Sequence, residues 1–198
     1  MDIYGGYRPA MEHILADLVT KIEEHGTGEN GEKLYEHLAT RIKSDESMRA
    51  KLRATGLEET TANALRGLTD SIGLRVVCLF IDDVYECVRI IKDFPGCSVV
   101  VEKDYIKNCK PNGYRSYHMI LDVTSEEPDV EGNTPGHYYV EIQLRTIAMD
   151  TWAALEHDLK YKKDISNPEM IAQELHRCAN DLAACDVSMQ TLRKIIRG

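Results

Sequence analysis

Apolar residues recur at intervals of three and four over residues 9–25, a pattern typical of an amphipathic helix. Glycines at positions 26, 28 and 31 end it. Residues 167–196 carry a second such pattern behind an Asn167-Pro168 start, which predicts a long helix. The apolar stripe expected on this helix is Ile171, Leu175, Cys178, Leu182, Cys185 and Met189. Long terminal helices of this kind often mediate self-association, although the same stripe can instead pack on the rest of the fold.

The centre of the chain alternates between strand and helix patterns. The β-branched apolar run within 70–81 predicts a central strand, 82–94 a helix and 97–107 another strand. This order indicates one crossover unit in a mixed sheet. Further strands are predicted at the end of 33–43 and over 119–123 and 137–145, with shorter helices over 48–55, 59–68 and 146–159. We therefore expect an α+β fold, a mixed sheet flanked by helices, in one domain spanning 1–198.

Composition narrows the class of protein. With 43% hydrophobic and 29% charged residues the chain is typical of a soluble globular protein. No apolar run approaches the roughly 20 residues that a membrane span requires, and the first residues lack a secretory signal pattern, so we expect a cytoplasmic protein. The six cysteines are scattered without metal-ligand spacing, which favours reduced thiols.

Charge is distributed unevenly. The net charge of −9 argues against a long polyanion such as DNA or tRNA as the main partner. Residues 41–53 nevertheless hold five basic residues against Asp45 and Glu46, and residues 103–118 hold four against Asp104, so each segment has a local charge of +3. Two compact basic segments on an acidic background suit a confined site for a small anion.

The segment 103–118 combines its cations with a turn and aromatic rings. Lys110-Pro111-Asn112-Gly113 must turn between two strands, and the segment also carries Tyr105, Tyr114 and Tyr117. Cations for phosphate beside rings for a base are the chemistry that a nucleotide needs. Ser47 and the basic residues at the start of the predicted helix 48–55 are suited to bind a phosphate. The alternative for both segments is an ordinary solvated surface.

Two carboxylates complete the set. Asp70 and Glu141 lie on separate predicted strands, each with an arginine nearby, Arg75 and Arg145. Acids that hold Mg²⁺ and cations that spread over phosphates are typical of phosphoryl-type transfer. In the strand 137–145, Glu141, Gln143 and Arg145 share one face; an exposed antiparallel edge would explain this as well. Each acid alone is more often a structural ion-pair partner.

Six motifs occur in one order along the chain. They are Arg41-Ile42-Lys43 with Ser47 and Lys51, Asp70 to Arg75, Lys103 to Ile106, Lys110 to His118, Glu141 to Thr146, and Trp152 to His157. In this order they resemble the motifs of the RelA/SpoT-type alarmone synthetases, and more closely the single-domain small alarmone synthetases. The resemblance covers a core of about residues 35–163, with helical extensions at 8–25 and 167–196.

The resemblance implies a nucleotidyltransferase-like fold, a homotetramer and transfer of pyrophosphate from ATP to the 3′-hydroxyl of GDP or GTP, giving ppGpp or pppGpp. It assigns ATP binding to Arg41, Lys43, Ser47, Lys51 and Arg75. Asp70 and Glu141 would bind Mg²⁺ and form the catalytic pair, with Glu141 drawing the proton from the attacking hydroxyl. The guanine nucleotide would meet Lys103, Lys110, Asn112, Tyr114, His118 and Gln143, with Tyr114 stacking on the base.

Two alternatives remain open. The first is the same fold acting on another acceptor, an adenosine nucleotide or the 3′ end of tRNA, against which the net charge and the Tyr114-Asn112 pair both weigh. The second is a non-catalytic guanine-nucleotide-binding regulator, which would have no need of two metal-ready acids. The sequence leaves open the preference between GDP and GTP. It also leaves open activation by pppGpp, because this chain has His37-Leu38-Ala39 where the activated members of the family carry Phe and Thr.

Overall fold

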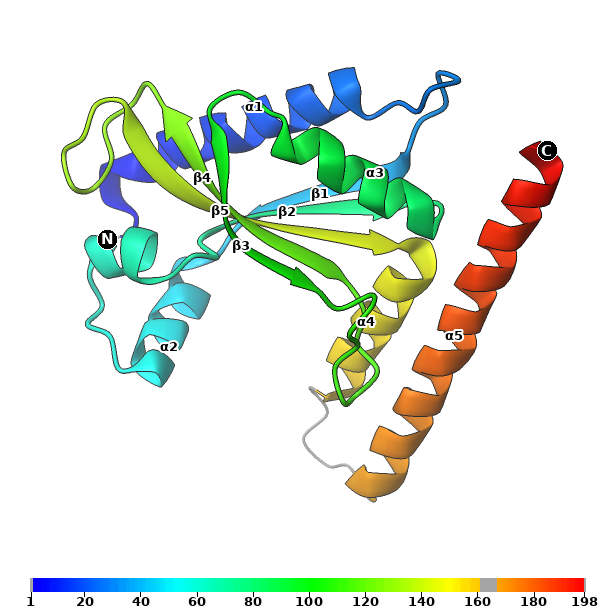
Figure 1. Cartoon of the computed structure of the whole chain (residues 1–198). Coiled ribbons are helices and arrows are strands. Elements are labelled where there is room, and N and C mark those ends of the chain that lie inside the picture. Colours follow the sequence, from blue (N-terminus) through cyan, green and yellow to red (C-terminus); the bar gives the residue numbers. More distant parts are fainter. Residues whose placement is uncertain (1, 161–166, 198) are drawn as a thin grey trace.

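A single five-stranded mixed sheet forms the centre of the molecule (Figure 1). The computed structural model describes residues 2–160 and 167–197 of the chain. The strands are β1 (Tyr35–Ile42), β2 (Ile72–Cys78), β3 (Cys97–Asp104), β4 (Tyr117–Ser125) and β5 (Gly136–Thr146), in the order β1-β2-β5-β4-β3. β5 is central and pairs parallel with β2 and antiparallel with β4. The α+β class and the mixed sheet are confirmed.

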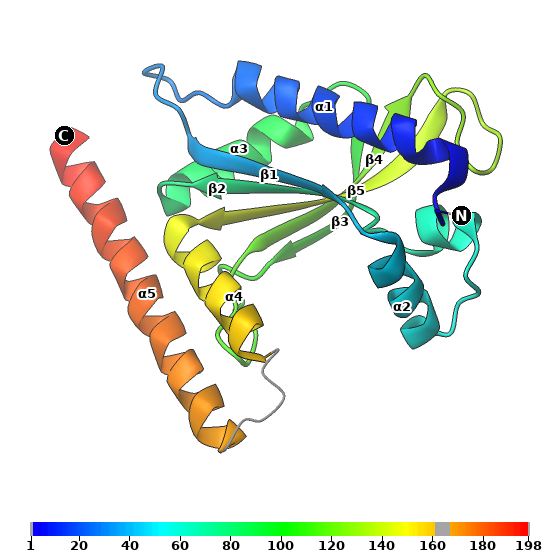
Figure 2. The same ribbon diagram turned by 180° about the vertical axis from the view of Figure 1, so that it is seen from behind.

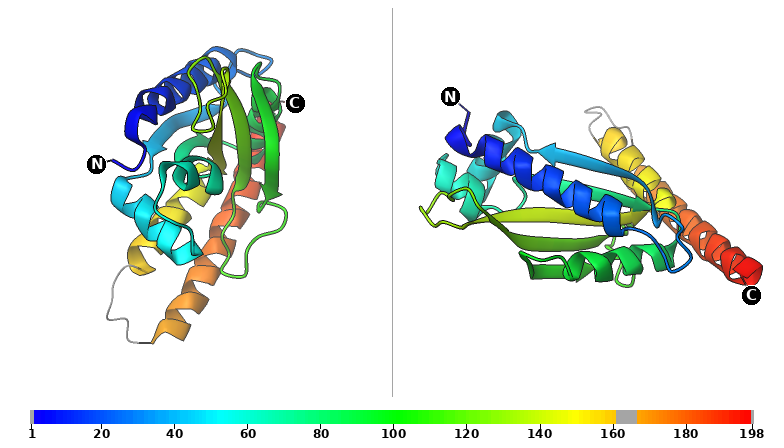
Figure 3. Two further views of the ribbon diagram at one scale, coloured as in Figure 1. Left: turned by 90° about the vertical axis from the view of Figure 1, so that its left-hand side faces the viewer. Right: turned by 90° about the horizontal axis from the view of Figure 1, so that it is seen from above.

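Helices cover one face of this sheet and extend from its ends. α1 (Arg8–His25) packs on β1, β2 and β4, and α3 (Ile81–Lys92) packs on β2, β3 and β5, as Figures 1 and 2 show from the two sides. α2 (Asp45–Thr55) and a π-helical turn (Asn63–Gly67) lie between β1 and β2 in the chain. α4 (Ile147–Lys160) continues from β5, and α5 (Pro168–Arg197) runs beside α4 and α3 (Figure 3). A short 3₁₀ turn (Gly5–Tyr7) precedes α1.

The core follows from the two-residue period of the strands. Alternate residues of β2 and β5 are buried against the apolar faces of α1 and α3, which supply Met11, Leu18, Val84 and Ile91 among others. The strand residues on this side include Ile72, Leu74, Val76, Val140, Ile142 and Leu144. The intervening residues of the same strands must therefore point to the opposite face, which α1 and α3 do not cover.

Several boundaries differ from the sequence predictions. The strand 97–107 ends at Asp104, because the Asp104 carboxylate accepts hydrogen bonds from the backbone N–H groups of Ile106 and Lys107 and so closes a turn. The strand 70–81 begins only at Ile72, which leaves Asp70 just ahead of it. β2 and β3 do run in the same direction around the crossover helix, but β5 and β4 lie between them.

The apolar stripe predicted for the last helix is wrong in part. Cys178, Cys185 and Met189 are exposed, and the buried positions of α5 are Ala179, Asp186 and Gln190. Two polar residues can be buried because each finds a partner: the Thr146 hydroxyl donates to Asp186 at 2.6 Å, and Gln190 bonds the start of α3. The solvent-facing side of α5 consequently keeps a set of apolar side chains, Val187, Met189, Leu192, Ile195 and Ile196.

Within residues 2–160 and 167–197, no helix has both the length and the apolar character needed to cross a membrane. All six cysteines are free in the structure, and Cys78 and Cys87 are the buried ones.

Candidate active site

The register of the sheet aligns the predicted site residues in two rows across its uncovered face. In the first row Arg41 of β1 pairs with Gly73 of β2, and Gly73 pairs with Glu141 of β5. In the second row Arg75, Gln143, His118 and Lys103 are successive cross-strand neighbours from β2 to β3. We call these residues, together with Arg145, the polar face. Because β5 is central, an exposed sheet edge no longer explains its alternating polar residues.

A shallow hollow of about 190 Å³ opens between β1, β2 and β5. Its lining consists of Ala39, Thr40, Arg41, Gly73, Leu74, Arg75, Glu141 and Gln143. Gly73 adds no side chain to the floor of this hollow, and a Cβ there would lie in van der Waals contact, 3.4 Å, with the side chain of Arg41. The hollow thus places one carboxylate between two arginines, an arrangement suited to an anionic ligand that also binds a cation.

A chain of hydrogen bonds leads from Glu141 to the loop between β3 and β4. Gln143 Nε2 donates to Glu141 Oε2 at 3.0 Å, and Gln143 Oε1 accepts from Arg145 at 2.9 Å. The same Arg145 nitrogen donates to the Tyr114 hydroxyl at 2.6 Å. Arg145 is 5% exposed. A buried guanidinium with its donors used in this way fixes the positions of all its partners.

His118 is neutral at pH 7 in this environment. Burial, followed by the charges of Arg145, Lys110, Lys103 and Arg75, lowers the pKa of His118 from 6.5 to about 4. Its Nε2 lies 2.8 Å from the Tyr114 hydroxyl, which already accepts a bond from Arg145 and is therefore assigned as the donor to Nε2. The ring proton then sits on Nδ1, which faces Glu141 Oε1 at 3.8 Å.

Asp150 joins the two arginines of the polar face and was missed by the sequence predictions. Its Oδ1 lies 3.1 Å from Arg75 and 3.0 Å from Arg145. Asp150 stands in the first turn of α4, directly after β5. Nothing in the sequence around Asp150 marks it as part of the site, because Arg75 comes close to it only in the folded protein. The Nε of Arg75 is buried and has no hydrogen-bond partner among the described residues.

The loop 105–116 brings the predicted guanine-site residues beside this network. The Lys110 ammonium lies 5.0 Å from the centre of the Tyr114 ring and 4.7 Å from that of Tyr105. Asn112 donates to Glu156 of α4 at 3.1 Å and accepts from the Tyr114 N–H. Tyr117, counted among the stacking rings, is instead 7% exposed in the core, because it lies one residue from His118 and so on the opposite face.

Asp70 belongs to a second cluster at the start of β2. Its Oδ2 accepts from Lys51 at 2.6 Å and also from Lys43. Burial raises the pKa of the Asp70 carboxyl, but the bonds and charges of the two lysines outweigh this effect, and the pKa stays below its usual value. The described contacts of Asp70 and Glu141 have no partner in common. The structure therefore groups Lys43, Lys51 and Asp70, and separately groups Glu141 with the polar face.

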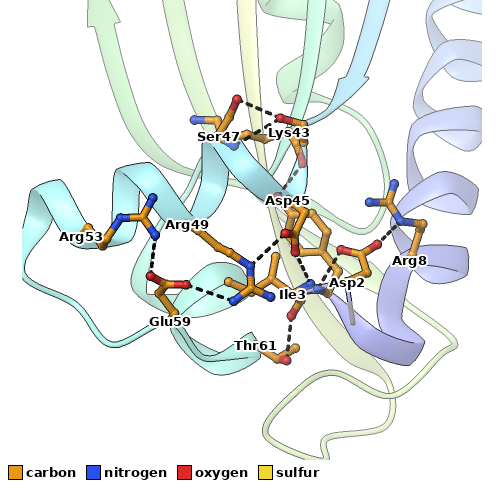
Figure 4. Close-up of polar contacts among 12 residues, drawn as sticks. Asp2, Ile3, Arg8, Lys43, Asp45, Ser47, Arg49, Arg53, Glu59 and Thr61 are labelled. Atoms are coloured by element: carbon orange, nitrogen blue, oxygen red, sulfur yellow. Dashed lines mark hydrogen bonds and ion pairs between the residues drawn. The ribbon is translucent and has the colours of Figure 1, made fainter.

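The start of α2 is held by the N-terminal segment (Figure 4). Ser44 caps the helix by accepting from the Ser47 N–H, and its hydroxyl donates to the Ser47 hydroxyl at 2.8 Å. Asp45 accepts from the Ile3 N–H and from Arg49. Tyr4, fully buried, donates to the Lys43 carbonyl at 2.8 Å. The backbone that carries Lys43 and Ser47 is thereby fixed at both ends.

The basic residues farther along α2 are paired with an acid. Arg49 donates to Glu59 at 3.0 Å and Arg53 donates to it at 2.6 Å (Figure 4). These contacts hold the segment after α2 against the helix. Of the cations in this basic segment, Lys43 and Lys51 are the ones that turn towards Asp70.

The two carboxylates are chemically suited to a hard divalent cation. Asp70 Oδ1 is buried and has no hydrogen-bond partner among the described residues, so one lone-pair-bearing oxygen is left unsatisfied. Glu141 Oε1 lies 3.8 Å from Nδ1 of His118, which is beyond hydrogen-bonding distance. Mg²⁺ is usually bound by one or two carboxylates together with substrate phosphates and water, so each of these oxygens is the type of ligand that this ion takes.

Known proteins share both the sequence pattern and the fold. Residues 40–166 match the family model described as the region found in RelA / SpoT proteins. The chain is 38% identical over 165 residues to the GTP pyrophosphokinase YwaC of Bacillus subtilis, a match that covers 83% of this chain and 77% of that protein.

Two solved structures from Bacillus subtilis give the same result in three dimensions. The small alarmone synthetase 2 superposes with a TM-score of 0.81 at 35% identity, covering 93% of this chain and 95% of that one. The small alarmone synthetase 1 bound to its product pppGpp superposes with a TM-score of 0.79 at 30% identity, covering 98% and 96%. Fold and site together define an enzyme of the synthetase class. The chain belongs to the RelA/SpoT family.

Proposed function

We propose that this enzyme transfers pyrophosphate from ATP to the 3′-hydroxyl of GDP or GTP, which yields ppGpp or pppGpp and AMP. The observation that supports this most directly is the hydrogen-bonded chain from Glu141 through Gln143 and Arg145 to Tyr114. It links a carboxylate suited to proton abstraction with a ring suited to stacking on a purine. The likeness to a small alarmone synthetase bound to pppGpp supports the guanine nucleotide as acceptor.

The donor phosphates would lie between the arginines of the polar face and the two lysines that bind Asp70, Lys43 and Lys51, which we call the lysine cluster. This region is surrounded by Arg41 of β1, Lys43 just after β1, Lys51 of α2 and Arg75 of β2, and Ser47 offers a hydroxyl at the start of α2. Cations spread over several elements can follow negative charge as it shifts from the transferred group to the leaving phosphate. Arg75 would also be linked to the acceptor side of the site, because it and Arg145 form ion pairs with the same carboxylate, Asp150.

The acceptor would occupy the side of the polar face next to the loop 105–116. Its base would stack on Tyr114, with Asn112 and Gln143 as polar neighbours, and its phosphates would meet Lys103 and Lys110. His118 acts in its neutral form, so it would offer a ring N–H rather than a charge. Glu141, through Oε1, would take the proton of the 3′-hydroxyl as that oxygen attacks.

Asp70 and Glu141 would hold Mg²⁺. When bound, the ion would neutralise phosphate charge in the transition state. In the structure, Lys43 and Lys51 already pair with the Asp70 carboxylate and keep it ionised at neutral pH, which is the form that a cation needs.

One assay separates this proposal from its alternatives. The purified protein is incubated with Mg²⁺ and labelled ATP, and GDP, GTP, GMP, ATP and tRNA are offered in parallel as acceptors. Formation of ppGpp or pppGpp is the expected result. Labelled tRNA or adenosine products would favour the other acceptor class, and nucleotide binding without any product would favour a non-catalytic regulator.

Glu141→Gln is the matched test of the mechanism. It keeps the hydrogen bond to Gln143 but removes the charged base, so the rate should fall by about a hundredfold or more. Glu23→Gln, on an exposed position of α1, is the control and should leave the rate unchanged. Full activity of Glu141→Gln would remove Glu141 from the mechanism.

We further propose that the enzyme assembles as a homotetramer in the cytoplasm. The assembly is supported by the exposed apolar side of α5, where Ile195 is 71% and Ile196 is 83% exposed. Exposed large apolar residues gathered on one helix are typical of a surface that another chain covers.

A further inference from the structure

The loop 105–116, which carries Tyr114, rests directly on α5. Gly113 has φ of +91°, and a Cβ at this position would lie only 2.5 Å from the Cβ of Ala179 on α5. The turn itself is closed by the Gly113 N–H, which donates to the Lys110 carbonyl at 2.8 Å, and by the Lys110 N–H, which donates to the Tyr114 carbonyl at 3.1 Å. The tip of the loop is therefore compact and pressed against the helix.

Arg115 fastens this loop to the helix. One guanidinium nitrogen donates to the Gly113 carbonyl at 3.0 Å and to the Ala179 carbonyl at 3.3 Å. The other donates to the Asn180 side-chain oxygen at 3.2 Å. The first acceptor belongs to the loop and the other two belong to α5. A single half-buried side chain thus bridges the two segments, with a planar fork that a lysine cannot reproduce.

α5 can serve as a support because it is attached to the rest of the fold at several points. Trp152 of α4 donates to the Leu175 carbonyl at 2.8 Å, and Thr146 donates to Asp186 at 2.6 Å. Nearer the C-terminus, Arg193 pairs with the buried Asp83 of α3. α5 packs beside α4 and, to a smaller extent, beside α3 (Figures 1 and 2).

We infer that Arg115 is a positioning residue for the acceptor nucleotide, which holds the Tyr114 ring in place by tying its loop to α5. This inference rests on the proposed function. A loop that is already ordered loses little conformational freedom when a ligand binds, whereas an untied loop must be ordered at that moment. Among the residues proposed for the donor, Arg41, Lys43, Ser47 and Lys51 have no described contact with the loop, and Arg75 reaches Tyr114 only through Asp150 and Arg145. The effect should therefore fall mainly on the acceptor.

The central comparison is Arg115→Ala against Arg177→Ala. Arg177 lies on α5, the helix that Arg115 contacts, and among the described residues its ion pairs are with the exposed Glu174 and Asp181. For Arg115→Ala we expect the KM for GDP to rise about tenfold, a loss of about 1.4 kcal/mol, with the KM for ATP and kcat at saturating GDP within about twofold. Arg177→Ala should match the parent chain. Equal rises in both KM values, or no rise in the KM for GDP, would overturn the inference.

Two further variants test whether Arg115 acts through the helix. Asn180→Ala removes one acceptor on α5 without touching the loop, and it should raise the KM for GDP by about threefold, roughly the value of one hydrogen bond. Combined with Arg115→Ala it should add nothing more. Arg115→Lys should remain impaired. Full recovery in Arg115→Lys would mean that only the charge matters, so that Arg115 meets the nucleotide directly, and would overturn the inference.

The binding of GDP can also be measured without the reaction, through the fluorescence of Trp152. Trp152 is the only tryptophan of the chain, its ring centre lies 6.3 Å from that of Tyr114, and its N–H bonds α5. Titration of GDP without ATP should change its fluorescence, at higher GDP concentration in Arg115→Ala than in the parent chain. If the parent chain binds GDP but forms no product, the proposed function fails while this comparison still stands. Identical titration curves would overturn the inference itself.

Discussion

The guanidinium of Arg145 donates a 2.6 Å hydrogen bond to the Tyr114 hydroxyl, which itself lies 2.8 Å from Nε2 of His118. A tyrosine held by its hydroxyl keeps its ring in one orientation, although it comes from a loop. The same arginine is joined through Gln143 to Glu141. The proposed stacking ring and the proposed base are therefore positioned by one buried side chain.

This relationship predicts different outcomes for two substitutions of Tyr114. Tyr114→Phe keeps the ring and loses the bonds to Arg145 and His118, so the KM for GDP should rise only a few-fold. Tyr114→Ala removes the stacking surface, which is worth about 1–3 kcal/mol per base, and should raise that KM by about tenfold or more. Steady-state kinetics with GDP varied at saturating ATP would measure both. Equal effects of the two substitutions would mean that the ring does not stack on the base.

His118 predicts a pH dependence of stability. Its pKa in the folded protein is about 4, below the value of 6.5 for an unperturbed histidine. Between these values the unfolded chain binds the proton and the folded chain does not, so stability falls as the pH is lowered through this window. The contribution should be about 2 kcal/mol smaller at pH 5 than at pH 7.

Urea unfolding of the parent chain and of His118→Gln at the two pH values would isolate this effect. The difference in unfolding free energy between the two proteins should shrink as the pH falls, because glutamine does not titrate. His25→Gln, at an exposed position at the end of α1, serves as the control. A difference that is constant with pH would show that His118 titrates normally.

The position of Asp70 beside Lys43 and Lys51 predicts how its substitution changes the Mg²⁺ requirement of the enzyme. Asp70→Asn removes the charge that Lys43 and Lys51 now face and weakens the proposed cation site. The Mg²⁺ concentration for half-maximal activity should rise by about tenfold or more, and chelation of divalent ions should abolish product formation in the parent chain. Asp17→Asn, on α1, is the control. An unchanged Mg²⁺ requirement in Asp70→Asn would exclude Asp70 as a ligand.

The exposed side of α5 predicts the assembly. Replacing Ile195 and Ile196 by glutamate places two charges among apolar side chains, and a tetramer covered at this surface should dissociate into smaller species. Light scattering after size exclusion would measure the mass, and circular dichroism would confirm the fold. Gln173→Glu adds one charge at an exposed position of the same helix and should leave the mass unchanged. If the double variant is still a tetramer, the subunits must contact one another through a different surface.

Much of the fold could be predicted because its signals are local. The three- and four-residue spacing of apolar positions in α1 and the β-branched run of β2 report burial directly along the chain. Ser44 and Gly56 mark the two ends of α2 by capping chemistry that needs no distant partner. The basic segments and the two acids were also visible, since charge and residue type belong to the sequence.

The polar face needed the tertiary structure. Which residues lie beside Glu141 depends on strand order, and β5 lies between β2 and β4 although it follows both in the chain. Asp150 acquires its place only when β2 brings Arg75 to it, and Arg115 only when α5 folds back onto the loop. By itself the sequence determined where strands, helices and charged groups occur, because these follow from local propensity and composition. Only the tertiary structure decided which groups meet, because contacts between distant segments depend on topology and register.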